Sequence, residues 1–285
     1  MNQARGYVSL LTGSFSTPAA GNPTVVIVDS AYRHRGLDAR HIICEVSPES
    51  LGDAVRGARA MGWAGFNCSV PHKVAVITHL DRLAVSAEMI GAVNCVVSRD
   101  GELVGENTDG RGFVASLQTV IDPAGQKIVL FGAGGAAQAI AVESALAGAT
   151  SITVVNRSPA RGAALVQLIR TRTQASAELA AWSECYRVPE DAGIVVNATS
   201  IGLSGAGQSR LDLEADSLAR HMVVADVIPN PARTAFLEDA QARGCTTLDG
   251  RGMLVNQAVI GIGLWTGVEA DATVMRRALE SELGS

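Results

Sequence analysis

The chain is poor in aromatic residues, in paired cysteines and in positive charge. Aromatics make up 4% of the 285 residues, charged residues make up 18%, and the formal net charge is −5 at pH 7. A nucleic-acid surface needs clustered lysine and arginine, so this balance argues against a nucleic-acid partner. The five cysteines are widely spaced without a CxxC pair. This spacing is typical of reduced thiols, and we expect neither a disulfide framework nor a metal site.

Long apolar runs are also missing. No run approaches the roughly 18 to 20 apolar residues that a membrane-spanning helix needs. The N-terminal segment lacks the apolar core of a signal peptide. We therefore expect a soluble, cytoplasmic protein without a membrane partner. What the chain does have is 47% hydrophobic residues and 30 glycines. That composition suits an α/β protein in which helices pack closely on a parallel sheet.

Two successive patterns predict two domains. The first hundred residues alternate short apolar runs with helical patterns, from a strand at Tyr7–Leu11 to a hairpin whose turn is Arg99-Asp100-Gly101. From Lys127 onwards, strand and helix follow each other at the spacing of a Rossmann-type, doubly wound parallel sheet. A helix over Gly112–Val120 leaves the boundary near Asp109. The predicted domains are residues 1–108 and 109–249, with the helices of residues 250–285 returning to the first.

A glycine turn marks a candidate cofactor site. The apolar strand Ile128–Phe131 runs into the sequence GAGGAA and then into a helical pattern. A pyrophosphate needs a backbone without an intervening Cβ, and N–H groups at a helix N-terminus. The spacing G-x-G-G-x-A is weak evidence alone, but the flanking strand and helix strengthen it. Gly132 and Gly134 supply the tight turn, and Gly135 and Ala137 are expected to keep the helix near the sheet. The predicted contacts with the cofactor here are Gly132, Ala133, Gly134, Gly135 and Ala136.

The next strand favours NADP over NAD. It ends in Asn156-Arg157, with Arg161 four residues further on, where NAD enzymes usually carry Asp or Glu for the ribose hydroxyls. A 2′-phosphate requires a planar cation and a second charge nearby, so we expect all three residues to contact NADP. NAD stays open, because two solvated arginines at a helix start would look the same. A third loop follows a buried strand at Asn197, and we expect its Thr199 to touch the cofactor.

Three polar clusters interrupt the apolar pattern of the first domain, each at the end of a predicted strand where loops converge. They are NCSVPHK at 67–73, GAVNC at 91–95 and GENTDGRGF at 105–113. These segments resemble the shikimate dehydrogenase signatures N-V-T-V-P-x-K, G-A-V-N-T and N-T-D-x-x-G-F. The glycine turn, the Asn156-Arg157-Ser158 segment, the loop at 197–202 and GRGMLVNQA at 250–258 match the same family in the same order. The resemblance runs from Ser14 to Gln257.

The resemblance implies an NADP-dependent oxidoreductase that transfers a hydride between NADP and a ring hydroxyl of shikimate. This is the 3-dehydroshikimate reduction of the shikimate (chorismate) pathway towards aromatic amino acids. It assigns Lys73 as the group that accepts and returns the hydroxyl proton, and Asp109 as the group that holds the lysine and a neighbouring hydroxyl. Met253 matches a residue beside the nicotinamide. The implied substrate contacts are Ser14 and Ser16 for the ring carboxylate, together with Asn67, Ser69, Asn94 and Gln257.

Four departures from the family pattern leave the substrate open. The chain has Ala20 and Gly21 where the family has S-P-x-x-H-N, and it has Cys68 and Cys95 in the next two motifs. Pro229 stands where the family commonly has a tyrosine that gives the substrate a hydroxyl. The alternatives are a quinate/shikimate dehydrogenase that prefers NAD, an enzyme for a shikimate analogue, and a non-catalytic ligand-sensing protein. A monomer and a homodimer both remain open.

Overall fold

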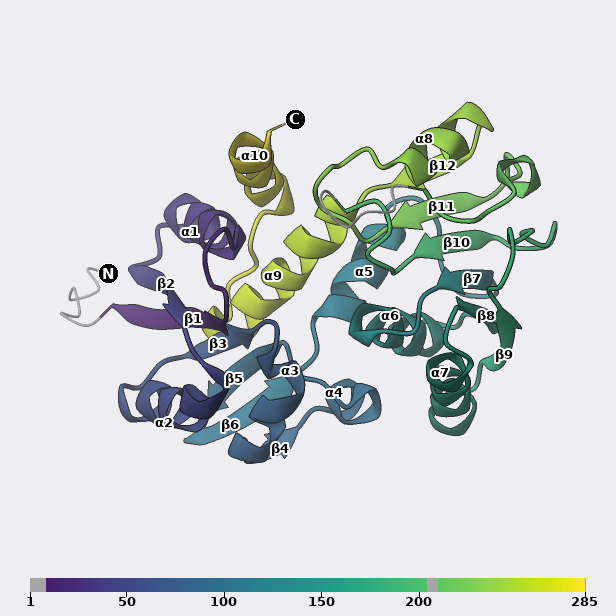
Figure 1. Ribbon diagram of the computed structural model, residues 1–285. Helices are drawn as coiled ribbons and strands as arrows, with labels where there is room; N and C mark the ends of the chain where they lie inside the picture. The colour runs from purple at the N-terminus through teal and green to yellow at the C-terminus, as the bar shows by residue number, and fades with distance from the viewer. Residues whose placement is uncertain (1–8, 204–209, 285) are drawn as a thin grey trace. The chain divides into compact units, whose positions relative to one another are not determined.

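The computed structural model describes residues 9–203 and 210–284 (Figure 1). The chain divides into two compact units. Unit 1 contains the chain up to Thr108 together with Ala258–Gly284, and unit 2 contains Asp109–Gln257. The expected boundary near Gly250 is the start of helix α9 (Gly250–Thr266), and the two units divide within this helix. No helix in the described ranges is long and apolar enough to cross a membrane.

Unit 1 is built on a mixed six-stranded sheet of order β2-β1-β3-β5-β6-β4. Strand β1 pairs in parallel with β2 and β3, whereas β5 pairs antiparallel with β3 and β6. The strands are β1 (Leu10–Ser16), β2 (Ala39–Glu45), β3 (Gly65–Cys68), β4 (Arg82–Leu83), β5 (Cys95–Arg99) and β6 (Glu102–Glu106). The helices are α1 (Thr24–Arg35), α2 (Leu51–Ala60), α3 (His72–Ala75), α4 (Val85–Ile90) and α10 (Ala272–Leu283), with short 3-10 turns at Pro48–Ser50 and Val76–His79.

Strand β1 lies further along the chain than the strand expected at Tyr7–Leu11. Tyr7 falls outside the described residues, and the observed strand continues through Gly13-Ser14-Phe15 to Ser16. An added Cβ at Gly13 would lie 2.4 Å from the Trp63 ring and 2.7 Å from the Ile42 carbonyl oxygen. The glycine therefore lets this tryptophan pack directly on the strand. Ser14 and Ser16 therefore lie on a buried strand and not in a turn.

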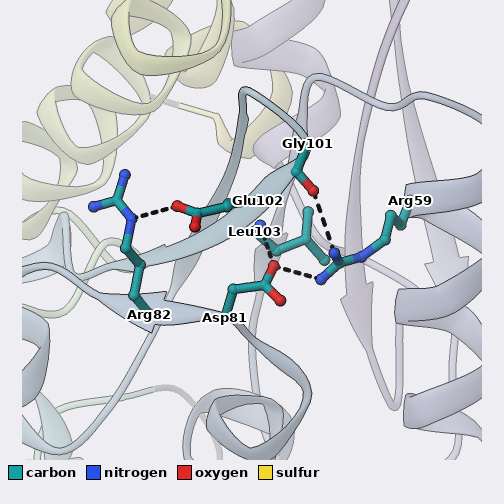
Figure 2. Close-up of polar contacts among 6 residues, drawn as sticks. All are labelled: Arg59, Asp81, Arg82, Gly101, Glu102 and Leu103. Carbon is teal, nitrogen blue, oxygen red and sulfur yellow. Dashed lines mark hydrogen bonds and ion pairs between the residues drawn. The ribbon is translucent and has the colours of Figure 1, made fainter.

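The hairpin of β5 and β6 is attached to its neighbours by a small ionic cluster. Asp81 accepts hydrogen bonds from the Leu103 backbone N–H at 2.7 Å and from the Arg59 guanidinium at 2.6 Å, and these donors lower the pKa of Asp81. Arg59 also donates to the Gly101 carbonyl in the turn. Figure 2 shows these contacts, with the ion pair of Arg82 and Glu102 beside them. The turn predicted at Arg99-Asp100-Gly101 is present. Asp100 and Gly101 both have a positive φ there, of 51° and 85°.

Unit 2 is a doubly wound parallel sheet, as the strand and helix spacing predicted. Its order β12-β11-β10-β7-β8-β9 is that of a Rossmann fold. Apolar side chains of α5, α6 and α7 pack on one face, and those of α8 and the β9–β10 connection pack on the other. The strands are β7 (Lys127–Phe131), β8 (Ser151–Asn156), β9 (Ser176–Ala181), β10 (Ile194–Asn197), β11 (Val223–Asp226) and β12 (Thr246–Leu248). The helices are α5 (Asp109–Leu117), α6 (Gly135–Leu146), α7 (Pro159–Arg172) and α8 (Ala235–Ala242), with a 3-10 turn at Ala215–Ser217.

Helix α5 begins at Asp109, three residues before the predicted start at Gly112. Two glycines explain the difference, because both are needed for close packing inside the helix. An added Cβ would lie 2.3 Å from the Ala139 carbonyl oxygen at Gly110, and 2.6 Å from the Gln257 backbone nitrogen at Gly112. The glycines that discourage a helix in sequence therefore let α5 pack tightly on α6 and α9. This packing fixes the position of Asp109 in unit 2.

Candidate active site

In unit 1, three predicted substrate contacts gather at the carboxyl ends of β1 and β3. Ser14 pairs in register with Asn67, and Ser16 lies two residues further along β1, so the three side chains share one face of the sheet. All three residues are buried. Asn67 donates from Nδ2 to the Asn94 carbonyl oxygen at 3.1 Å, and Asn22 donates to Ser14 Oγ at 3.5 Å.

Two polar atoms of this face have no hydrogen-bond partner in the described part of the chain. They are Ser16 Oγ and Asn67 Oδ1, and both are shielded from water. An unpaired buried polar atom costs about 1–3 kcal/mol, so such atoms are rare without a functional reason. The expected contact of each residue with substrate would supply the missing partner, and it stays a prediction. Both atoms lie on the face of β1 and β3 where the motifs predict substrate contacts.

Lys73 lies on the short helix α3, which the buried His72 anchors. The His72 ring makes a 2.8 Å hydrogen bond through Nε2 with the Val46 carbonyl oxygen, and its backbone N–H donates to Ser69. Lys73 itself is half-buried, and its carbonyl oxygen accepts from the Val93 N–H at 2.8 Å. No group of potential metal ligands occurs in the described ranges. The hydrogen bonds of His72 anchor this helix, and the proton-transfer role of the Lys73 amine stays a prediction.

Asn94 has a structural contact that the motif alone did not reveal. Its Oδ1 accepts from the Thr108 backbone N–H at 2.7 Å, and its Nδ2 donates to the Thr108 hydroxyl at 3.0 Å. The amide thus holds the residue that precedes Asp109, so the predicted contact of Asn94 with substrate stays a prediction. Because the neighbouring Val93 binds the Lys73 carbonyl, one dipeptide fixes both the Lys73 backbone and the chain that leads to Asp109.

A carboxylate that sequence reasoning missed lies at the end of β2. Glu45 pairs in register with Ser16 and accepts hydrogen bonds from the Thr17 hydroxyl at 2.5 Å and the Ala19 backbone N–H at 2.6 Å. These donors, that of Thr17 above all, lower the pKa of Glu45. It holds the start of the loop in which Gly21 replaces the family histidine, and it stands opposite Ser16 on the neighbouring strand. No sequence motif indicates Glu45, because its position opposite Ser16 depends on how β1 and β2 pair.

In unit 2, the glycine turn has the shape that a pyrophosphate requires. Gly132 has a φ of 109°, and its Cβ position would lie 2.8 Å from the Ala198 carbonyl oxygen, so only glycine fits. Gly134 caps α6 without a side-chain hydrogen bond. Cβ atoms at Gly134 and Gly135 would meet no protein atom within 4 Å. The expectation that Gly135 keeps the helix near the sheet is therefore wrong, because the space beside it is open; Ala137 is fully buried instead. The predicted contacts Ala133 and Ala136 belong to the same turn.

Arg157 follows β8 and lies over an aromatic ring. Its Cζ is 4.9 Å from the centroid of the Trp182 indole, and its Nη2 is 3.8 Å from an Asp212 carboxylate oxygen. Asn156 donates to the Ser158 carbonyl, and Ser158 caps α7 by accepting from the Arg161 backbone N–H. Sequence reasoning found the arginines but not Trp182. That residue follows β9, a strand with no clear sequence pattern.

The third loop is held by saturated hydrogen bonds. The Thr199 hydroxyl donates to Asn197 Oδ1 at 2.7 Å and accepts from the Ile201 N–H at 3.1 Å. Asn197 in turn donates to Asp226, which also accepts from the Thr234 hydroxyl at 2.7 Å. Burial raises the pKa of Asp226. Thr199 therefore fixes the loop through its side chain, and a contact with cofactor through its backbone remains a prediction.

The last predicted residues lie on helix α9. Gln257 is buried and donates from Nε2 to the Leu254 carbonyl at 3.1 Å, while the half-buried Met253 packs against the core of unit 2. The Pro229 carbonyl oxygen accepts from Arg251 Nε at 3.2 Å. Pro229 stands where the family has a tyrosine, and it contacts α9 through its backbone carbonyl instead of a side-chain hydroxyl.

These features define a nicotinamide-dependent dehydrogenase. Unit 2 is a Rossmann sheet with a glycine turn and with an arginine after its second strand. Unit 1 is an α/β unit that carries a lysine and buried polar groups without partners. Three family descriptions match the chain. They are the shikimate dehydrogenase substrate binding domain over residues 17–96, shikimate/quinate 5-dehydrogenase over 116–229, and the shikimate 5'-dehydrogenase C-terminal domain over 250–280. The chain belongs to the shikimate/quinate dehydrogenase family, which confirms the predicted family and its class of oxidoreductase.

Individual relatives agree on the fold and differ in name. The shikimate dehydrogenase (NADP(+)) of Thermococcus kodakarensis is 38% identical over 94% of this chain and 95% of its own. A Listeria monocytogenes shikimate 5-dehydrogenase, solved with shikimate and NAD, is 32% identical with a TM-score of 0.90 over 98% and 99% of the two chains. The ligand-free 5-ketofructose reductase of Gluconobacter sp. strain CHM43 is 57% identical with a TM-score of 0.94 over 97% and 99%.

Proposed function

We propose that this protein transfers a hydride between NADP and a ring hydroxyl of a small polyhydroxylated substrate, with shikimate and 3-dehydroshikimate as the pair that the motifs support. The observation that carries the proposal is the pair of buried, unpaired oxygens of Ser16 and Asn67, on the unit that also carries Lys73. The five cysteines are free thiols, which fits a reducing compartment, and we place the reaction in the cytoplasm.

The residues of the chain supply proton transfer and orientation. When the substrate hydroxyl is oxidised, its proton passes to the Lys73 amine, and in the reverse direction the Lys73 ammonium returns that proton to the oxygen of the reduced carbonyl. Asp109 accepts a hydrogen bond from a neighbouring hydroxyl. Ser16 binds the ring carboxylate of shikimate and Asn67 bonds a ring hydroxyl, so that the bound molecule reacts in one orientation.

The residues of unit 2 fit NADP. The open space beside Gly134 and Gly135 accommodates a pyrophosphate at the start of α6, and the N–H groups there lack a side-chain cap. Arg157 would hold the 2′-phosphate. When bound, the nicotinamide supplies the hydride acceptor, and the protein supplies position and charge.

A second substrate candidate is 5-ketofructose. Two observations favour it for this chain over shikimate. The 57% identity to a 5-ketofructose reductase exceeds the 38% identity to the shikimate dehydrogenase of Thermococcus kodakarensis. Glu45 stands opposite Ser16 on the neighbouring strand, and its exposed, solvent-screened charge disfavours a ring carboxylate more than a neutral keto sugar.

The test is a direct assay of the purified protein at the absorbance band of the reduced nicotinamide. Shikimate and quinate are offered with NADP and with NAD, and 5-ketofructose is offered with NADPH and with NADH. Formation of NADPH from shikimate supports the first substrate, and faster consumption of NADPH with 5-ketofructose supports the second. A Glu45→Gln variant sharpens the choice, because loss of this charge is expected to improve kcat/KM for shikimate and leave that for 5-ketofructose unchanged. Absence of turnover with all three substrates would contradict the proposal.

A further inference from the structure

The guanidinium of Arg157 is held by a tryptophan that no motif includes. Trp182 is 7% exposed, and the Arg157 Cζ lies 4.9 Å from its ring centroid. The indole packs edge-on against Phe131, with ring centroids 5.1 Å apart, and Phe131 directly precedes the glycine turn. The Trp182 backbone N–H donates to the Asn156 carbonyl at 3.2 Å. The indole is thus a rigid platform between the glycine turn and the arginine.

The same indole also fixes the acidic residue beside the arginine. Trp182 Nε1 donates to the Asp212 carbonyl oxygen at 2.9 Å. The Asp212 carboxylate lies 3.8 Å from Arg157 Nη2, and both side chains are more than half exposed. An exposed pair at this distance is weak and is easily exchanged for a stronger anion. A phosphate dianion can therefore take the place of Asp212 at the guanidinium.

We propose that Trp182 is the positioning residue that sets the preference of this site for NADP over NAD; this rests on the proposed function only in taking NADP as the cofactor. A guanidinium that lies over an aromatic face makes its attraction to the ring through its plane. Because this attraction uses the face of the indole and not a hydrogen bond, the guanidinium N–H groups stay available for a paired hydrogen bond to phosphate oxygens. Trp182 acts through Arg157. NAD has no 2′-phosphate for the arginine to bind, so the affinity for NAD should not depend on Trp182.

The position of Trp182 also makes it part of the core, so a purely structural role must be separated from the proposed one. Its contact with Phe131 reaches the strand that carries the glycine turn, and both cofactors need that turn. A structural defect would therefore weaken NADP and NAD together. A positioning role would weaken NADP alone and would disappear in a protein without Arg157.

The experiment measures the Kd of NADP and of NAD by calorimetric titration of the full chain without substrate. The variants are Trp182→Leu, Trp182→Phe, Arg157→Leu and the double variant of Arg157→Leu with Trp182→Leu. Trp265→Phe is the matched control, because Trp265 is an equally buried tryptophan of unit 1 whose Nε1 donates to a backbone carbonyl, that of Val96. Asp212→Asn tests the competing carboxylate.

We expect Trp182→Leu to weaken NADP about fivefold to tenfold and NAD less than twofold, since a partly exposed cation–aromatic contact has about this strength. Trp182→Phe keeps a ring and should keep most of the preference. In the Arg157→Leu background, Trp182→Leu should cause no further loss of NADP affinity. Asp212→Asn should tighten NADP about twofold and leave NAD unchanged.

Equal weakening of both cofactors by Trp182→Leu would overturn the inference, as would a loss of NADP affinity that persists without Arg157. An unchanged Kd for NADP in Trp182→Leu would do the same. A wild-type chain that binds NAD as tightly as NADP would contradict the proposed cofactor and this inference together. Because no substrate is present, a wrong substrate assignment leaves the result unaffected.

Discussion

The two units prepare for their ligands in different ways. Unit 2 presents backbone: Gly132 at a φ of 109°, and the open space at Gly134 where a Cβ would meet no atom. In its third loop the Thr199 hydroxyl already has a partner in Asn197. Unit 1 presents side chains, and two of their oxygens, on Ser16 and Asn67, have no partner among the described residues. We therefore expect the cofactor to be recognised mainly by main-chain shape, and the substrate by individual side-chain atoms.

This contrast explains where the chain departs from its family. Substitutions at Gly21, Cys68 and Cys95 all fall in unit 1, and only Pro229 falls in unit 2. A surface recognised by side chains changes its ligand when single residues change, whereas a glycine turn tolerates little change. The cofactor site should therefore be common to the family, and the substrate should differ between members.

The largest expected effect is on turnover, from loss of the Lys73 amine. Lys73→Met should lower kcat about 10³-fold, because proton transfer by a positioned group contributes on that order. The Kd of NADP should not change, since the cofactor residues belong to unit 2. Initial-rate assays with the better of shikimate, quinate and 5-ketofructose measure kcat. Calorimetric titration with NADP measures the Kd.

The chain offers a matched control for this change. It has only two lysines, and the other, Lys127, forms an exposed pair with Asp191 at 2.5 Å. Lys127→Met should keep full activity. Retention of more than a tenth of wild-type kcat in Lys73→Met would remove the lysine from the mechanism.

Two neighbouring glycines test how unit 2 uses its backbone. Gly132→Ala should destabilise the fold by about 2–4 kcal/mol, because a positive φ and a backbone oxygen 2.8 Å from the new Cβ both oppose alanine. Gly134→Ala should leave the free energy of unfolding within about 0.5 kcal/mol, since its φ of −90° suits alanine. The same variant should weaken NADP binding, because the methyl group enters the space assigned to pyrophosphate.

Urea unfolding and cofactor titration of the two variants are compared side by side. Equal loss of stability in both would mean that the turn is only a structural feature. Unchanged cofactor affinity in Gly134→Ala would place the pyrophosphate elsewhere.

The two units should also differ in their response to acid. Burial of His41 lowers its pKa from the usual 6.5 to about 4. The folded state therefore binds fewer protons than the unfolded state between these values, and unit 1 should lose about 2–3 kcal/mol as the pH falls from 6.5 to 4. In unit 2, the raised pKa of Asp226 has the opposite sign, because the folded state holds that proton more tightly as the pH falls.

Tryptophan fluorescence separates the two responses, since Trp63 and Trp265 report on unit 1 and Trp182 reports on unit 2. Urea titrations at pH 7.0, 5.5 and 4.5 should show the unit 1 signal lost first at low pH. His41→Gln removes the titrating group and should flatten this dependence. A pH dependence that survives this substitution would assign it to another group.

Much of this architecture could be predicted from the sequence, because strong local signals agree with the final fold. Apolar runs such as Ile128–Phe131, followed by a glycine turn, predict a buried parallel strand and its helix. Strand β9 (Ser176–Ala181) was not predicted, because its sequence SAELAA has few β-formers and it forms through pairing with β8. The position of β1 was also missed, since Gly13 looks like a turn until Trp63 is placed against it.

The site shows the same division. The motifs gave the identity of Lys73 and Arg157, but not which side chains have partners. That Asn94 bonds to Thr108, or that Glu45 pairs in register with Ser16, depends on contacts between distant segments. Hydrogen-bond saturation is a property of the folded chain, and it is what separates positioning residues from ligand contacts.

The smallest effect makes the sharpest test of the contrast between the units, because it predicts opposite outcomes for two hydroxyl groups. Ser16→Ala removes a buried hydroxyl without a partner, so stability should be unchanged or higher by up to about 1 kcal/mol, while KM for the substrate rises about tenfold. Thr199→Val removes a hydroxyl that donates to Asn197 and accepts from Ile201, so it should cost about 1–2 kcal/mol and leave KM for the substrate unchanged. Thermal unfolding and steady-state kinetics of both variants provide the measurement. If Ser16→Ala is the destabilising change and KM stays constant, the serine is a packing residue, and the substrate must be held by other side chains of unit 1.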